Sequence, residues 1–150
     1  MIYLQDVPKD YTYCFAGKDT CPKATTCLRA IAAQLLTDGQ ESQPATIRTV
    51  NSLYLKQLPT PESCSLYRNN EPVRYAKGMT HLFDELTLKQ AHLVRLRVMN
   101  CFSCESYFYF SRNGQRLISP QEQQSILHAF HSTGVSITPK FDEFRYEINW

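Results

Sequence analysis

The chain has 150 residues, of which 43% are hydrophobic and 20% are charged, and its formal net charge is +2. This length suits one folded domain with one core, and so small a net charge gives no electrostatic argument for nucleic-acid binding. The chain has only five glycines, which argues against an architecture dominated by loops.

The N-terminus gives no indication of export or membrane insertion. The first eight residues, Met-Ile-Tyr-Leu-Gln-Asp-Val-Pro, contain no basic segment followed by an apolar run, so they do not resemble a signal peptide. The most apolar stretch, Leu28 to Leu36, is interrupted by Arg29 and Gln34 and is too short to cross a bilayer. We therefore expect a cytoplasmic protein with no membrane partner, in which thiols normally stay reduced.

The N-terminal half predicts one helix, one short strand and a long loop. Proline suits the first turn of a helix, so Cys21-Pro22 predicts a helix start, and Asp38-Gly39 predicts its end. Between them, apolar residues recur at helical spacing: Leu28, Ile31, Ala32 and Leu35. Alternation over 46–50 predicts a short strand, and the proline- and asparagine-rich segment 58–72 predicts a loop.

The C-terminal half predicts more regular structure. We expect a short strand at 73–76 and a helix over 88–100 with Thr87 as its N-cap. The aromatic segment 106–112 is typical of a strand, and Asn-Gly at positions 113 and 114 is the strongest short hairpin signal, so a hairpin is expected over 106–118.

A second capped helix and an extended tail complete the chain. Ser119-Pro120-Gln121-Glu122 has the form of a capping box with proline just inside the helix, and Gly134 predicts the helix end. The aromatic tail, 135–150, is expected to be extended and to dock on the core.

Together these elements predict a small α+β domain spanning 1–150. It has about three main helices and a small, mostly antiparallel sheet that includes the hairpin at 106–118. Within it we distinguish a cysteine-containing part, about 1–70, and a helix-hairpin-helix part, about 80–150.

Four cysteines near the N-terminus are the most informative residues. Cys14, Cys21 and Cys27 are separated by six and five residues, and Cys64 follows after thirty-six more. Four thiolates can close a tetrahedral Zn²⁺ shell or hold an iron–sulfur cluster. Such a closed site would be structural, because it leaves zinc no open position. It would tie an irregular segment and the 58–72 loop to the first helix.

Other interpretations of these cysteines stay open. Zinc sites usually have Cys pairs two to four residues apart, and the wider spacings here suit a cluster at least as well. Unlinked thiols and disulfides are the alternatives. Cys27 is the weakest candidate ligand, because it lies beside apolar residues and could be a core thiol.

A second combination joins a Cys-x-x-Cys pair to two histidines. Cys101 and Cys104 form the pair, and His128 and His131 lie three residues apart on the last predicted helix. They could make a Cys₂His₂ zinc site, or the pair alone could be redox-active. The expected position, after a helix and before a strand, is the wrong context for a redox pair, and ordinary thiols with solvent-facing histidines are the simpler interpretation.

The aromatic hairpin offers a weak nucleic-acid hypothesis. Tyr107 and Tyr109 would lie on one face of the strand, where rings can stack on bases while Arg112 and Arg116 contact phosphates. The simpler interpretation is that one face packs in the core, since aromatic residues are common in strands.

The chain contains no phosphate-binding glycine loop and no nucleophile-elbow motif. We therefore lean away from an enzyme and find no indication of a small-molecule substrate. The expected function is a non-enzymatic binding or regulatory module with a structural metal site, whose partner is a protein or a nucleic acid. The alternative is a redox enzyme or sensor that uses an iron–sulfur cluster or the Cys101/Cys104 pair.

Several short motifs resemble a family of uncharacterised small proteins from Bacteroides-type gut bacteria. They are Tyr13-Cys14-Phe15, Cys21-Pro22, Cys27-Leu28-Arg29, Cys64, Tyr67-Arg68, Ser119-Pro120, Phe141-Asp142 and Asn149-Trp150. The resemblance covers nearly the whole chain. It implies a bacterial, cytoplasmic protein of no known activity, and it includes the first four cysteines but not Cys101 and Cys104.

Overall fold

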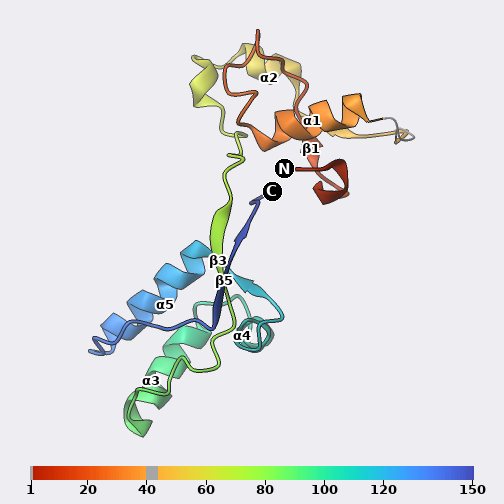
Figure 1. The fold of residues 1–150 in the computed structure, drawn as a ribbon. Helices are drawn as coiled ribbons and strands as arrows, with labels where there is room; N and C mark the ends of the chain where they lie inside the picture. The colour runs from red at the N-terminus through yellow and green to blue at the C-terminus, as the bar shows by residue number, and fades with distance from the viewer. Residues whose placement is uncertain (1, 40–43) are drawn as a thin grey trace. The chain divides into compact units, whose positions relative to one another are not determined.

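The structure is a computed structural model that describes residues 2–39 and 44–150. It has the predicted α+β composition, with helices beside a small antiparallel sheet and a separate parallel strand pair (Figure 1). The chain forms two compact units. The N-terminal unit comprises Met1–Glu71 and Ile148–Trp150, and the C-terminal unit comprises Pro72–Glu147.

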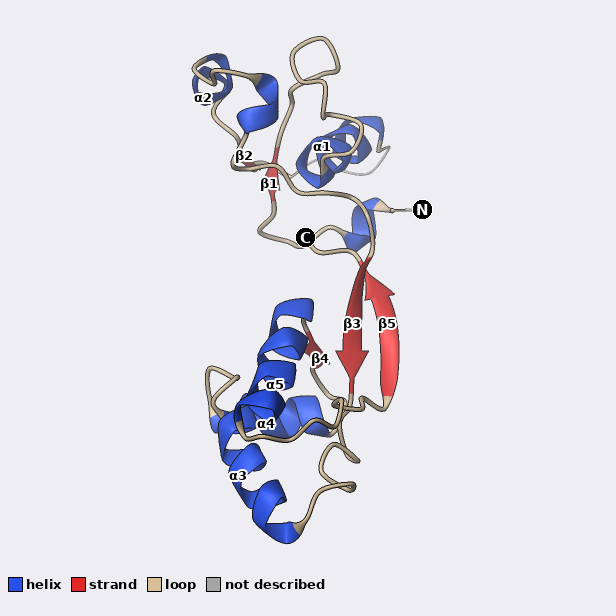
Figure 2. Ribbon diagram, turned by 90° about the vertical axis from the view of Figure 1, so that its left-hand side faces the viewer, coloured by secondary structure: helices blue, strands red, loops and turns tan. Residues whose placement is uncertain are grey.

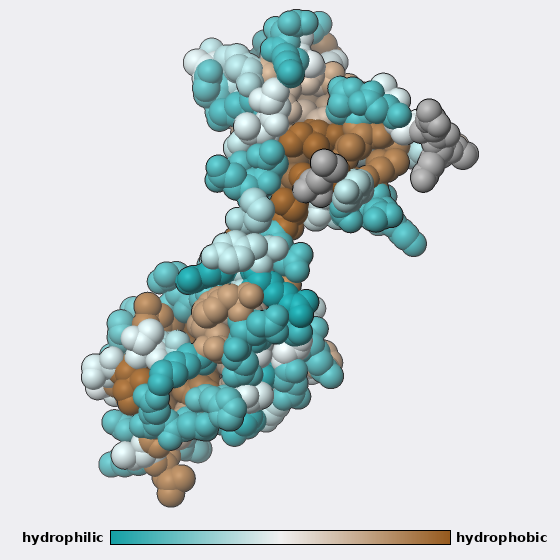
Figure 3. Space-filling view, viewed as in Figure 1, coloured by the Kyte–Doolittle hydropathy of each residue, from teal (hydrophilic) through white to brown (hydrophobic). Residues whose placement is uncertain are grey.

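Short elements make up the N-terminal unit. Their order is η1 (Leu4–Asp6), β1 (Thr12–Tyr13), α1 (Leu28–Asp38), β2 (Arg48–Thr49), α2 (Ser52–Lys56) and η2 (Pro61–Ser63). Strands β1 and β2 pair in parallel. One face of α1 packs on a small core of Tyr11, Tyr13, Leu28, Ala32, Ala33 and Leu36, and Trp150 returns to it. Hydrophobic residues also gather over α1 on the face seen in Figure 3.

Helix α1 begins later than predicted. Residues 22–26 form turns, and Cys27 is the N-cap residue in an extended conformation. The cause is long-range pairing: Cys27 forms an isolated antiparallel bridge with Asn69, and the Leu28 amide donates to the Arg68 carbonyl oxygen at 2.8 Å. The backbone of residues 26 and 27 forms hydrogen bonds or bridges with residues 69 and 70, so these residues do not adopt helical conformation.

The C-terminal unit is built on a three-stranded antiparallel sheet. Its elements are β3 (Val73–Lys77), α3 (Leu88–Met99), α4 (Glu105–Arg112), β4 (Leu117–Ile118), α5 (Pro120–Ser132) and β5 (Glu143–Glu147), and the strand order is β4-β3-β5. Helices α3 and α5 lie side by side (Figure 2). Their buried faces meet the sheet around Ala76, Met79, Val94, Val98, Phe108, Ile118, Ile126 and Phe130.

Both predicted helix caps in this unit are confirmed. The Thr87 hydroxyl accepts a hydrogen bond from the Gln90 amide, and the Ser119 hydroxyl accepts one from the Glu122 amide at 3.2 Å. In each case the backbone amide of the cap residue donates a hydrogen bond to the side-chain oxygen of the residue at the third helical position. These capping boxes satisfy helix-start amides that have no partner within the helix.

The predicted hairpin over 106–118 is wrong, because residues 105–112 form helix α4. Phe108 and Ser111 are both fully buried, which is the three-residue spacing of a helix face. Asn113 is the C-cap, and Gly114 follows with a φ of +72°. The Gly114 amide donates to the Ser111 carbonyl oxygen and the Gln115 amide to that of Phe110, which completes a Schellman motif. Asn-Gly therefore ends a helix here, and β4 pairs with β3.

Candidate functional site

The four N-terminal cysteines lie in different segments of the N-terminal unit. One follows β1, one lies in the turns before α1, one is the α1 N-cap, and one is the C-cap of η2: Cys14, Cys21, Cys27 and Cys64. All four line one cavity of about 20 Å³. Residues that are up to fifty positions apart in sequence therefore line the same cavity.

Backbone hydrogen bonds produce this convergence. The Cys14 amide donates to the Arg29 carbonyl oxygen at 3.0 Å, which fixes the end of β1 against the first turn of α1. On the other side, the Asn70 amide donates to the Thr26 carbonyl oxygen, beside the Cys27–Asn69 bridge. These contacts hold the segment that follows Cys64 against the start of α1.

The side chain of Arg29 also links the β1 segment and the segment after Cys64 to the start of α1. Its Nη1 donates to the Thr12 carbonyl oxygen at 2.9 Å, and its Nε donates to the Leu66 carbonyl oxygen at 3.0 Å. These acceptors lie two residues from Cys14 and Cys64 respectively. A rigid, multi-donor guanidinium is suited to holding two backbone segments at once.

The surroundings of Cys14 raise the pKa of its thiol. Burial raises the pKa of Cys14, the Ala16 backbone amide lowers it by hydrogen bonding to the sulfur, and the charges of Cys27, Cys21 and Cys64 raise it again. Thiolates that repel one another in this way are stabilised when a cation binds among them.

The cysteines line the cavity without forming a finished coordination shell. Over residues 2–39 and 44–150, no three His, Cys, Asp or Glu side chains are already gathered into a group able to hold a metal ion. All six cysteines, each within the described ranges, are free thiols. The described part of the chain therefore contains no preformed metal-binding group.

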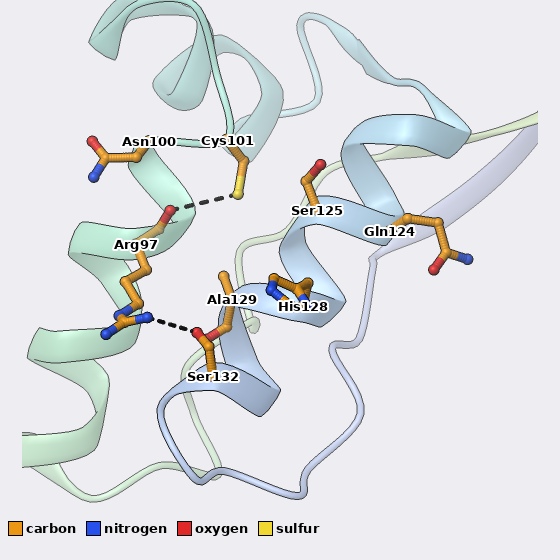
Figure 4. Close-up of a pocket in the computed structure, with 8 residues that line it drawn as sticks. All are labelled: Arg97, Asn100, Cys101, Gln124, Ser125, His128, Ala129 and Ser132. Atoms are coloured by element: carbon orange, nitrogen blue, oxygen red, sulfur yellow. Dashed lines mark hydrogen bonds between the residues drawn. The ribbon is translucent and has the colours of Figure 1, made fainter.

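The second predicted combination is only partly assembled. Cys101 and His128 line an open pocket between α3 and α5, but Cys104 and His131 are not among its lining residues (Figure 4). The Cys101 thiol donates to the Arg97 carbonyl oxygen at 3.5 Å. Burial and then the charge of Glu122 raise the pKa of Cys101. A raised pKa lowers the fraction of nucleophilic thiolate.

The Cys-x-x-Cys pair precedes a helix, which corrects the predicted helix-then-strand context. Cys104 is exposed and is the N-cap residue of α4, although its side chain makes no capping hydrogen bond. The position of the pair therefore no longer argues against a redox function, but the raised pKa of Cys101 does.

The predicted nucleic-acid residues lie around α4. Tyr107 and Tyr109 are 43% and 36% exposed. Arg116, however, binds Glu122 at two points, and its guanidinium lies 5.0 Å from the ring centroid of Tyr107. One of the two arginines expected to contact phosphates is thus neutralised by a carboxylate.

A family model described as a family of unknown function, DUF6078, matches residues 1–150. The chain belongs to this DUF6078 family. The predicted resemblance to an uncharacterised family over nearly the whole chain is therefore confirmed, and the Bacteroides-type origin stays a prediction. No curated protein and no solved structure matches the chain.

Two residues of the cysteine cavity were missed by the sequence analysis. Lys23 and Arg29 line it together with the thiols. Each stands two positions after a cysteine, in the patterns Cys21-x-Lys and Cys27-x-Arg, and this repeat is the signal that could have found them. Among the helices that the structure describes in this DUF6078 chain, none is both long and apolar enough to cross a membrane.

Proposed function

We propose that Cys14, Cys21, Cys27 and Cys64 bind a structural metal and that this DUF6078 chain is a non-enzymatic binding or regulatory module. The observation that carries the proposal is the convergence of these four cysteines, from four separate segments, on one small cavity. A cytoplasmic setting, in which thiols remain reduced, is part of it.

The architecture of the N-terminal unit supports a structural role. Its helices α1 and α2 and its two-residue strands bury few side chains, so local structure alone provides little stability. A metal held by four thiolates adds binding free energy that the unfolded chain does not share. The cavity is lined by residues that follow β1, that begin α1 and that lie in and after η2, so a cross-link there would join segments far apart in sequence.

The test is metal analysis of anaerobically purified protein, with labile sulfide and an absorption spectrum. We expect one bound metal per chain and loss of that metal in Cys14→Ser. Cys104→Ser is the matched control, because it removes an exposed thiol of the C-terminal unit. Purified protein with no stoichiometric metal, and no uptake when Zn²⁺ or iron with sulfide is supplied, would overturn the proposal.

Stability measurements separate a structural metal from an incidental one. Removal of a structural ligand is expected to unfold much of the N-terminal unit, because apo sites of this kind rarely fold fully. Equal melting temperatures for Cys14→Ser and Cys104→Ser would show that the four cysteines are ordinary thiols.

The partner is proposed to be a protein or a nucleic acid. The exposed rings of Tyr107 and Tyr109 support contact with either, whereas the pairing of Arg116 with Glu122 weakens the phosphate-binding role. Binding of mixed-sequence oligonucleotides at two salt concentrations tests the second class. Salt-dependent binding that weakens in Arg112→Ala supports it, and unchanged binding in that variant removes this surface as the site.

A further inference from the structure

Strand β5 forms an open edge of the sheet in the C-terminal unit. It pairs with β3 on one side, and over residues 2–39 and 44–150 no strand lies on its other side (Figure 2). All five of its residues, Glu143–Glu147, are exposed. An open edge presents backbone amide and carbonyl groups that can pair with another strand. The opposite edge, β4, has only two residues, so β5 is the edge that can accept a full strand.

The aromatic residues of β5 lie on the face of the sheet that packs in the core. Phe144 pairs with the fully buried Ala76, and Tyr146 pairs with Arg74. Paired residues of an antiparallel sheet project to the same face, so both rings extend the core face of β3. They are nevertheless 44% and 69% exposed. Strand β5 therefore carries an uncovered aromatic strip next to the core.

The charged residues of β5 lie on the opposite face and alternate in sign. They are Glu143, Arg145 and Glu147, and Glu143 pairs with Lys77 across the sheet. Arg145 Nε donates to the Glu143 carboxylate at 3.0 Å, but both side chains are about half exposed. Ion pairs exposed to this degree contribute little free energy, so they can be exchanged for pairs with another strand.

This alternation makes β5 complementary to its own sequence in reverse. An antiparallel copy centred on Phe144 places Glu143 opposite Arg145 of the second copy, and the reverse. Centring on Tyr146 places Arg145 opposite Glu147 in the same way. Centring on Arg145 instead opposes two arginines and places Glu143 opposite Glu147. Because opposite charges across a strand pair stabilise it and like charges destabilise it, the two registers with an aromatic pair at their centre are favoured.

We propose that β5 is a self-association surface, through which two copies of this chain pair antiparallel into one sheet of order β4-β3-β5-β5-β3-β4. The partner is a second copy because the charges of β5 match their own reversed order. The pairing also brings the two aromatic strips together on one face. Both copies contribute the same edge, so the assembly closes at two. This surface belongs to the C-terminal unit and does not depend on the proposed metal site.

The experiment is sedimentation velocity over a range of protein concentrations, with charge-reversal variants of β5. Arg145→Glu leaves only acidic charges on the strand, and the double variant Glu143→Arg, Glu147→Arg leaves only basic ones. We expect the wild-type chain to dimerise, and each variant alone to dimerise about 10-fold more weakly or less. An equimolar mixture of the two variants should restore the dimer. Lys89→Glu, a charge reversal at an exposed position on α3, should dimerise like the wild type.

The mixture also controls for folding, because the two variants can pair through β5 only if both are folded. A wild-type chain that is monomeric at every concentration would overturn the proposal and leave the edge to a strand of another protein. Dimers that persist unchanged in both variants would place the interface elsewhere and overturn it too. Folded variants that fail to dimerise when mixed would rule out the charge-directed pairing.

Discussion

Arg116 and Glu122 form a two-point ion pair, with Nη2 to Oε1 at 2.8 Å and Nη1 to Oε2 at 3.2 Å. Arg116 Nη1 also donates to the buried Ser111 hydroxyl, and Glu122 accepts from the Ser119 amide. The pair thus joins the end of α4, the segment before β4 and the first turn of α5. It is a structural link of the C-terminal unit.

Arg116→Ala is therefore expected to lower the free energy of unfolding by about 1–3 kcal/mol, because it leaves a half-buried carboxylate and the Ser111 hydroxyl without a donor. Urea denaturation followed by circular dichroism measures the change. Arg112→Ala is the control, since no ion pair of its side chain is present in the described part of the chain. Equal stability of both variants would contradict this role.

The same pair predicts a pH dependence. Burial raises the pKa of Glu122, but hydrogen bonds from Arg116 and Ser119, with the Arg116 charge, lower it by more, so that it lies below the ordinary value of 4.5. A carboxyl with a lowered pKa stabilises the fold above its unfolded pKa and loses that contribution as pH falls through its folded pKa. We expect the melting temperature to drop below about pH 4.5, and the drop to be smaller in Glu122→Gln.

Tyr11→Phe tests the buried Tyr11 hydroxyl, which forms no hydrogen bond in the described part of the chain. Removing a buried O–H without a partner costs nothing in lost hydrogen bonds and removes its desolvation penalty, so metal-free protein should become more stable, by about 1 kcal/mol. Tyr13→Phe is the matched control in the same core. A marked loss of stability in metal-free Tyr11→Phe would show that the hydroxyl has an acceptor.

Gly114→Ala tests the end of α4. The residue has a φ of +72°, where a side chain costs about 1–2 kcal/mol. We expect thermal denaturation to show a loss of that size. Gly17→Ala, where an added Cβ meets nothing within 4 Å, should be neutral. Equal effects at both positions would argue against the Schellman motif.

Thiol reactivity tests the redox alternative. Cys104 is exposed, whereas burial and the charge of Glu122 raise the pKa of Cys101. In the Cys14→Ser, Cys21→Ser, Cys27→Ser, Cys64→Ser background, we expect Cys104 to react with a disulfide reagent and Cys101 to react more slowly than free cysteine. Reaction of Cys101 faster than that of free cysteine would support the redox-pair hypothesis.

Some features could be predicted because their causes are local in sequence. Helices α3 and α5 follow from the capping boxes at Thr87 and Ser119, whose partners lie three residues away. The extended conformations of β3 and β5 likewise follow from their own composition. The family resemblance also came from short motifs that the sequence alone displays.

Other features depended on residues far apart. Asn-Gly at 113 and 114 suits both a hairpin turn and a helix C-cap, and the burial of the α4 residue Phe108 in the core favoured the cap. The start of α1 was set by pairing with residues 68–70. The sequence by itself determined the capped helices and the presence of four cysteines, because those need only local patterns. Only the tertiary structure decided that Cys14 and Cys64 line one cavity together with Lys23 and Arg29, because backbone pairing between distant segments brings these segments to the start of α1.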